Sequence, residues 1–191
     1  SELNNLKNIS MLPDYAGVCG ITLDEMLTAM SDYIDDFAEA QEITREEAIE
    51  GLKRQYDGYH FTWPSPDIFN PYSLLNAFQD HDYTNYWFSS GTPTYLIEML
   101  RKFHLVPSDM NKMQVLAANF HAPTENMESI TPLLYQSGYV TIKDFNRATR
   151  LYTLDIPNNE IRVGLMESLL PNYVERRAEA GNTTIAKMYL A

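Results

Sequence analysis

Tyr56-Asp57-Gly58-Tyr59-His60-Phe61 is the stretch that decides how this chain folds, and Asn70-Pro71-Tyr72-Ser73 and Gly91-Thr92-Pro93-Thr94 follow it. A helical pattern ends at Gly58, because glycine takes the left-handed backbone conformation without steric cost. The aromatic side chains around it can anchor the turn in a core. We therefore expect the stretch to join a helical hairpin to the helix after Asn70, with Tyr56, Tyr59 or Phe61 buried and Gly58 in a conformation that other residues resist.

The hairpin itself is predicted from two capping boxes. Thr22-Leu23-Asp24-Glu25 precedes apolar residues at helical spacing, which predicts a helix over 23–40, and Thr44-Arg45-Glu46-Glu47 starts a second helix that ends at the Tyr56 turn. Asn70-Pro71 and Thr92-Pro93 each begin a further helix, because proline suits the first helical position. The acidic residues of the hairpin lie mostly opposite its apolar stripes, which favours a solvated face over a binding site.

The pattern changes after Thr131. A short helix through Tyr135 ends at Gly138, and residues 139–142 and 150–156 read as the two strands of a β-hairpin. Asn158 or Asn159 caps the next helix, whose pattern Pro171 interrupts. The sequence therefore predicts a mainly α fold with a small β-hairpin, an α+β protein, and a helix before a two-stranded ribbon is typical of the end of a winged helix.

Further motifs carry a resemblance. Together with the Tyr56 stretch, Leu3-Asn4-Asn5-Leu6, Tyr15-Ala16-Gly17-Val18-Cys19-Gly20 and Leu133-Leu134-Tyr135-Gln136-Ser137-Gly138-Tyr139 resemble the AAA-ATPase-like family that is common in bacteria. Proteins of that family have a nucleotide-binding core, then a helical and winged-helix-like region, and often a nuclease domain of the restriction-endonuclease superfamily. The resemblance implies a helical lid-like region over residues 1–125, a winged-helix-like region over 126–180, and the start of a linker over 181–191.

Phosphate-binding residues are missing from the sequence. None of the eight glycines lies in Gly-x-x-x-x-Gly-Lys-Ser/Thr, the loop whose amides and lysine surround phosphates. The chain thus resembles the part that follows the P-loop core, where it would couple nucleotide state to a partner or a nuclease domain without catalysing hydrolysis. We expect no cofactor in this part, ATP and magnesium in the parent protein, and the ATPase core and nuclease domain as partners.

The composition of the chain argues against a membrane protein and against a nucleic-acid-binding protein. The chain has no run of apolar residues long enough for a membrane span and no basic-then-apolar start, so we expect no membrane partner and a cytoplasmic parent protein. Its net charge of −12 disfavours nucleic acid as a partner. The alternative is a DNA-binding winged helix in which Lys143, Arg147 and Arg150 of the hairpin contact phosphates.

Few residues are candidates for catalysis or for ligand binding. Arg54 and Arg101, with Arg45, are candidates for an arginine that touches a nucleotide, although an ion pair with Glu50 explains Arg54 equally well. No catalytic residue and no metal site is predicted: Asp155, Glu160 and Arg162 only superficially resemble a nuclease pattern. Of the four histidines, His60 is the strongest functional candidate. The motif, including Asp57, Tyr59, His60 and Asn70, nevertheless reads mainly as structural. We expect Cys19 to be a small buried hydrophobic residue.

Overall fold

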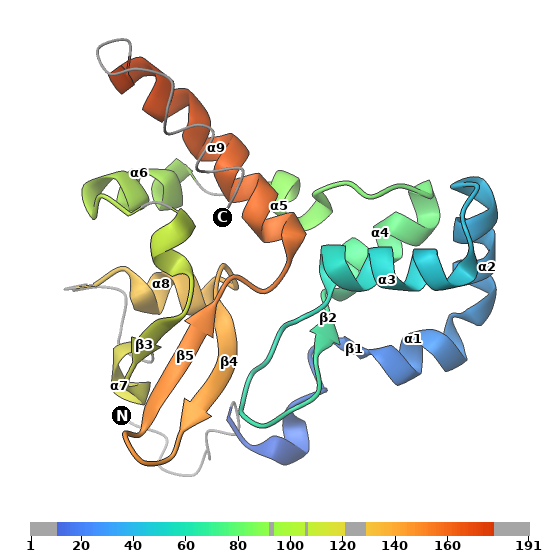
Figure 1. The fold of residues 1–191 in the computed structure, drawn as a ribbon, viewed down its shortest axis with the longest axis horizontal. Helices are drawn as coiled ribbons and strands as arrows, with labels where there is room; N and C mark the ends of the chain where they lie inside the picture. The colour runs from blue at the N-terminus through green and yellow to red at the C-terminus, as the bar shows by residue number, and fades with distance from the viewer. Residues whose placement is uncertain (1–10, 92–93, 106, 121–128, 178–191) are drawn as a thin grey trace, which may run out of the picture.

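Two hydrophobic clusters, one in each half of the chain, organise this computed structural model (Figure 1). The structure describes residues 11–91, 94–105, 107–120 and 129–177. The first cluster is centred on Phe37, Leu52 and Leu74. The second includes Leu134 and Leu165. The chain is a mixed α+β protein with two small antiparallel sheets.

Helices build the first half. Its elements are a 3-10 turn (Pro13–Tyr15), β1 (Ile21–Thr22), α1 (Leu23–Ala29), α2 (Ser31–Ala40), α3 (Arg45–Tyr56), β2 (Ile68–Phe69) and α4 (Pro71–Asp80). Both predicted capping boxes are present, at Thr22 and Thr44, and the Asn70 side chain caps α4. The helix predicted over 23–40 is two helices, because the backbone breaks at Met30 with φ −120°. That break lets buried residues of both α1 and α2 enter one cluster.

A two-stranded sheet ties the N-terminal segment to the motif. Ile21 pairs with Phe69 and Thr22 with Ile68, and Tyr59 forms a further bridge to Ile68. This pairing was not predicted, because two-residue strands have no periodic signal. It places the turn that carries Cys19 beside the Tyr56–Phe61 stretch.

The second half surrounds a three-stranded sheet. Its elements are α5 (Tyr86–Gly91), α6 (Thr94–Lys102), a 3-10 turn (Pro107–Met110), β3 (Met113–Val115), α7 (Ala117–Phe120), α8 (Thr131–Gln136), β4 (Thr141–Asn146), β5 (Leu151–Asp155) and α9 (Asn159–Arg177). The strand order is β3-β5-β4. The β4–β5 hairpin confirms the prediction, and Gly138 before it has the positive φ, +77°, of a helix stop. The short strand β3 was not foreseen.

Helix α9 begins at the junction of the two halves. The Asn158 carboxamide accepts a hydrogen bond from the Ile161 N–H at 3.2 Å, which makes it the predicted cap. Gly164 faces α5, where a Cβ atom would lie 2.3 Å from the Phe88 ring, so the two helices touch closely. Pro171 does not end α9, which continues to Arg177.

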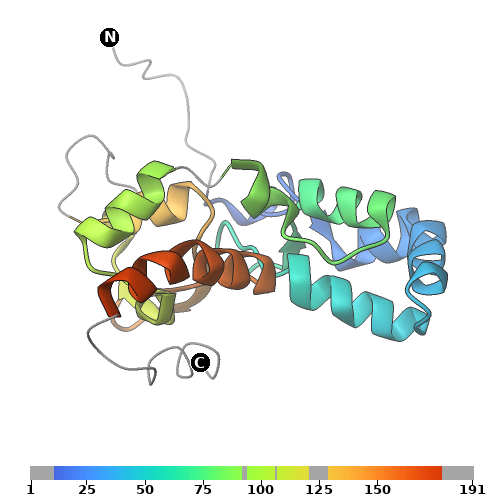
Figure 2. The same cartoon turned by 90° about the horizontal axis from the view of Figure 1, so that it is seen from above.

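Seen from above, the molecule is elongated, with α1–α4 at one end, the three-stranded sheet at the other, and α5 and the start of α9 between them (Figure 2). Among the described residues, none of the helices combines the length and apolar character that a membrane span requires. The predicted boundary between residues 125 and 126, the helix start at Thr92-Pro93 and the segment 181–191 all lie outside the described residues.

Candidate functional site

The Tyr56–Phe61 stretch lies at the junction. Helix α3 ends at Tyr56, which is fully buried and donates its hydroxyl to the Thr84 carbonyl at 2.9 Å. Gly58 has φ +100°, and a Cβ atom there would lie 2.5 Å from the Pro157 carbonyl oxygen, between β5 and α9. The expected burial of an aromatic and the expected left-handed glycine are both confirmed. The turn therefore passes in direct contact with the second half.

His60 is fastened both to its own loop and to β4. Its main-chain N–H donates to the Thr141 hydroxyl at 2.8 Å, and that hydroxyl donates to the His60 carbonyl at 2.8 Å. The His60 ring lies between Asp67, with Nε2 to Oδ1 at 2.7 Å, and Ser65, with Nδ1 to Oγ at 2.9 Å. His60 and Thr141 are buried, so these bonds are shielded from water.

Ser65, His60 and Asp67 are the three residue types of a hydrolase triad, but their arrangement differs. In such triads the carboxylate holds Nδ1 and the serine meets Nε2, whereas here the two contacts are exchanged. The Ser65 hydroxyl donates its one proton to the Thr62 carbonyl at 3.0 Å. This cluster therefore orders the loop and does not activate a nucleophile.

Lys143 turns inward from the hairpin. The register of β4 against β5 shifts between Ile142 and Asp144, so Lys143 is the extra residue of a β-bulge, which re-aims its side chain. Its ammonium donates to the Gly58 carbonyl and lies 3.7 Å from an Asp67 carboxylate oxygen. Burial lowers the pKa of Lys143, and the nearby carboxylates of Asp67 and Asp57 oppose that change.

The two carboxylates near Lys143 differ. Burial raises the pKa of Asp57 to about 6, although the Gly58 N–H, 2.8 Å from its Oδ1, favours the ionised form. The pKa of Asp67 is lowered, mainly because the His60 ring donates a hydrogen bond to it. The seam between the loop and the hairpin consists of these contacts of Gly58, His60 and Asp67 with Thr141 and Lys143, a polar network that is buried at His60 and Thr141 and reaches solvent at Asp67.

Glu160 joins three helices. Its fully buried carboxylate, in the first turn of α9, accepts hydrogen bonds from the Ser73 hydroxyl of α4 at 2.7 Å and from the Trp87 N–H of α5 at 2.8 Å. Burial raises its pKa, and these donors oppose the increase. Sequence reasoning missed this role, because Glu160 reads as an ordinary acidic residue in a first helical turn.

Asp155, Glu160 and Arg162, whose spacing resembles a nuclease pattern, do not share one site. While Glu160 is buried, Asp155 accepts the Ile156 N–H at 2.7 Å and Arg162 donates to Asn111 at 3.2 Å. Within the described part of the chain, no three His, Cys, Asp or Glu side chains gather as metal ligands would.

The candidate nucleotide arginines lie apart. Arg54 is exposed on α3, and Glu50 pairs with Lys53 at 3.0 Å instead of with Arg54. Arg101 is exposed at the end of α6, in the other half. Arg45 donates to the Ser31 carbonyl at 3.1 Å and so joins α2 to α3. The structure does not bring these three together.

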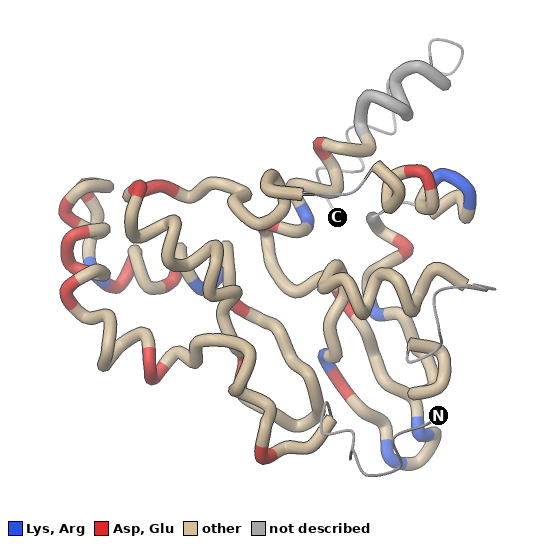
Figure 3. The backbone as a smooth tube through the Cα atoms, turned by 180° about the vertical axis from the view of Figure 1, so that it is seen from behind, with Lys and Arg blue, Asp and Glu red and all other residues tan. Residues whose placement is uncertain are grey.

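Charge separates the two ends of the molecule. Acidic residues follow α1–α3, and Lys and Arg mark the turn of the β4–β5 hairpin (Figure 3). Arg147 and Arg150 are exposed in that turn, whereas Lys143 is half-buried in the seam. Helix α8 carries no Lys or Arg.

An aromatic pocket of about 300 Å³ opens beside the seam. Five stretches of the chain line it, and the residues are Cys19, Tyr59, Phe61, Ile68, Phe69, Asn70, Pro71, Trp87, Tyr135, Gln136, Ser137 and Gly138. Cys19 is exposed at this pocket, so its expected burial is wrong: the turn before β1 holds it outside both clusters. The rings of Trp87 and Phe88 pack on Tyr139.

Comparisons with known proteins are sparse. The chain is similar to an "Uncharacterized protein in vnfD 5'region" of Azotobacter chroococcum mcd 1, at 30% identity over 186 residues, which are 96% of this chain and 34% of the relative. The chain thus spans about a third of that relative's length. No family model matches the chain. No solved structure matches it either.

Proposed function

We propose that this chain is a non-catalytic coupling segment of a larger AAA-ATPase-like protein, in which it relays nucleotide state to a partner or nuclease domain. The observation that carries the proposal is the seam at Gly58, His60 and Lys143, which fastens the helical half to the β4–β5 hairpin. The similarity of nearly the whole chain to one third of a longer protein supports a role inside a larger chain.

The second half fits a winged-helix-like module. The element order α6, β3, α7, α8, β4, β5 and the strand order β3-β5-β4 support this part of the proposal, because they are compatible with a winged helix. The helices α1–α4 would then form the lid-like region. A lid that moves with nucleotide state would displace β4 through the two buried hydrogen bonds between the His60 main chain and the Thr141 hydroxyl. It would displace α9 through the hydrogen bond between Ser73 and Glu160, because packed cores transmit displacements.

Two experiments test the coupling role. Isothermal titration of the 191-residue chain with Mg-ATP should show no tight binding, and tight magnesium-dependent binding would contradict the proposal. In the full-length parent protein, hydrogen–deuterium exchange with and without Mg-ATP should change at residues 56–70 and at β4 together. A nucleotide response that stops at α3 would contradict a relay through the seam.

DNA binding by the hairpin is the second candidate, and the exposed Arg147 and Arg150 favour it. It is ranked lower because α8, the helix that would enter a groove, has no cation, and Lys143 is engaged by Gly58 and Asp67. Salt-dependent anisotropy of labelled duplex DNA, weakened by Arg147→Glu with Arg150→Glu, would promote this candidate. Binding unchanged by those substitutions would remove it.

A further inference from the structure

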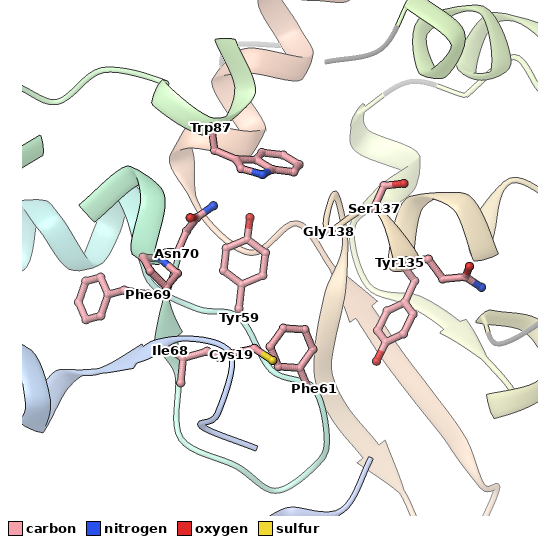
Figure 4. A pocket seen from close by; sticks show the side chains of 12 residues that line it. Cys19, Tyr59, Phe61, Ile68, Phe69, Asn70, Trp87, Tyr135, Ser137 and Gly138 are labelled. Carbon is pink, nitrogen blue, oxygen red and sulfur yellow. The ribbon is translucent and has the colours of Figure 1, made fainter. Parts of the chain in front are cut away.

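The aromatic pocket has walls from both halves of the molecule. Tyr59, Phe61, Asn70 and Trp87 come from the motif loop, α4 and α5, and Tyr135, Ser137 and Gly138 come from the end of α8. In Figure 4 the Tyr59 hydroxyl points toward Asn70 and the Trp87 ring, and Cys19 lies beside Phe61. Broad rings on several sides of one space make a surface for a flat ligand.

The walls carry no formal charge. No Lys, Arg, His, Asp or Glu is among the twelve lining residues. Burial raises the pKa of Tyr59, and the nearby carboxylate of Glu160 adds to that, so the phenol stays protonated at neutral pH. Burial also raises the pKa of Tyr135 to about 12. A phosphate would find no cation there, so the pocket suits an uncharged group.

Hydrogen-bond donors are fixed at one end. Oδ1 of Asn70 accepts the Tyr72 N–H at 3.0 Å and the Ser73 N–H at 3.4 Å, which orients its Nδ2 as a donor. Its amide and that of Asn158 adjoin the Tyr59 hydroxyl. Asn158 is 8% exposed, and its buried Nδ2 completes no hydrogen bond of normal geometry with the described residues. The Asn70 amide is therefore a fixed donor at the pocket wall, beside the Tyr59 hydroxyl.

We propose that this pocket binds a small, uncharged, planar heteroaromatic ligand whose ring nitrogen or oxygen accepts a hydrogen bond from Asn70 or Tyr59. A volume of about 300 Å³ is at the small end of ligand sites, which suits one bicyclic ring system. The site is independent of the coupling role, since it needs neither ATP nor a partner.

Adenosine is a suitable probe, because it is uncharged and does not fluoresce. In a Trp63→Phe background, Trp87 is the only tryptophan and reports on its own pocket wall. We expect saturable quenching, independent of magnesium, with a dissociation constant of about 1 mM or tighter for a ligand of this size. We also expect AMP, which carries a charged phosphate on the ribose of the same nucleoside, to bind at least about threefold more weakly, because no cation lines the site.

Matched variants decide whether the pocket is the site. Cys19→Trp should fill it from the exposed rim and weaken adenosine binding at least about tenfold, whereas Val18→Trp, at the adjacent exposed position outside the lining, should not. Asn70→Asp keeps an α4 cap but loses the amide donor, so it should weaken binding without changing Tm much. Three outcomes would each overturn the proposal. They are no response to adenosine at about 5 mM, binding of AMP that is equal or tighter, and adenosine binding that survives Cys19→Trp.

Discussion

At the scale of single residues, Gly58 and Asp57 set the seam. Gly58 is required both by its positive φ and by the Pro157 carbonyl that lies against it. Asp57 is a carboxylate held in a buried position by one main-chain N–H. Sequence reasoning reached the Gly58 conformation, because helix ends favour a left-handed glycine. It could not reach the partner, because Pro157 is far away along the chain.

Gly58→Ala tests this residue directly. We expect a loss of at least about 1 kcal/mol in the free energy of unfolding, because alanine resists the left-handed region and its Cβ would collide with main chain. Urea denaturation measures the change. Gly91→Ala is the control, since nothing lies within 4 Å of the Cβ that it adds. Equal stability of the two variants would show that the junction relaxes freely.

Asp57 predicts a pH dependence. Its folded pKa of about 6 is above the ordinary value of 3.8, so the native state binds a proton more tightly than the unfolded state does. This group therefore favours folding at low pH, and its contribution is lost as the pH rises from about 4 to about 6. Asp67, whose pKa is lowered, acts in the opposite sense below pH 4.

Asp57→Asn removes this titration and keeps an oxygen for the Gly58 N–H. We expect the variant to gain stability relative to the wild type between pH 4.5 and pH 7, because the neutral amide has no ionised form to desolvate. Denaturation curves at the two pH values measure the gain. A difference between variant and wild type that is the same at both pH values would contradict the assignment.

At the scale of elements, two contacts join helices and strands that the sequence treats as separate. Lys143 fastens β4 to the motif loop, and Glu160 fastens α9 to α4 and α5. Capping boxes, the hairpin and the helix starts were predictable, because each depends on residues within a few positions. These contacts between distant segments were not, since their partners lie 73 to 87 residues apart.

Glu160→Ala should lower stability by about 2–4 kcal/mol, because the Ser73 hydroxyl and the N–H groups of Trp87 and Phe88 would lose their acceptor at once. Its control is Glu167→Ala, an exposed position on the same helix, with little expected effect. A double-mutant cycle with Ser73→Ala should give a coupling energy of about 1–2 kcal/mol. Additive effects in that cycle would mean that Ser73 and Glu160 act separately.

Lys143→Met and Arg147→Met distinguish an internal contact from a surface charge on the same hairpin. We expect Lys143→Met to destabilise by about 1–2 kcal/mol, because the Gly58 carbonyl loses a charged donor, and Arg147→Met to be near neutral. Thermal melts of both variants provide the comparison. If Arg147→Met destabilised the protein more than Lys143→Met, the structural cation of the hairpin would be Arg147 and not Lys143.

At the scale of the whole molecule, the seam joins the two hydrophobic clusters, so we expect them to open as one unit. The α+β class followed from sequence patterns. How the two halves meet did not follow, because no periodicity records contacts between distant segments. The pocket is a product of that meeting, and its residues drew attention in the sequence only as motifs.

Native-state hydrogen exchange tests the claim most directly. The slowest amides of α3 and of β5 should report the same opening free energy within about 1 kcal/mol, and Gly58→Ala should lower both by a similar amount. Gly91→Ala should change neither. If Gly58→Ala lowers protection in α3 and leaves β5 unchanged, the halves open independently and the chain is not a coupling segment.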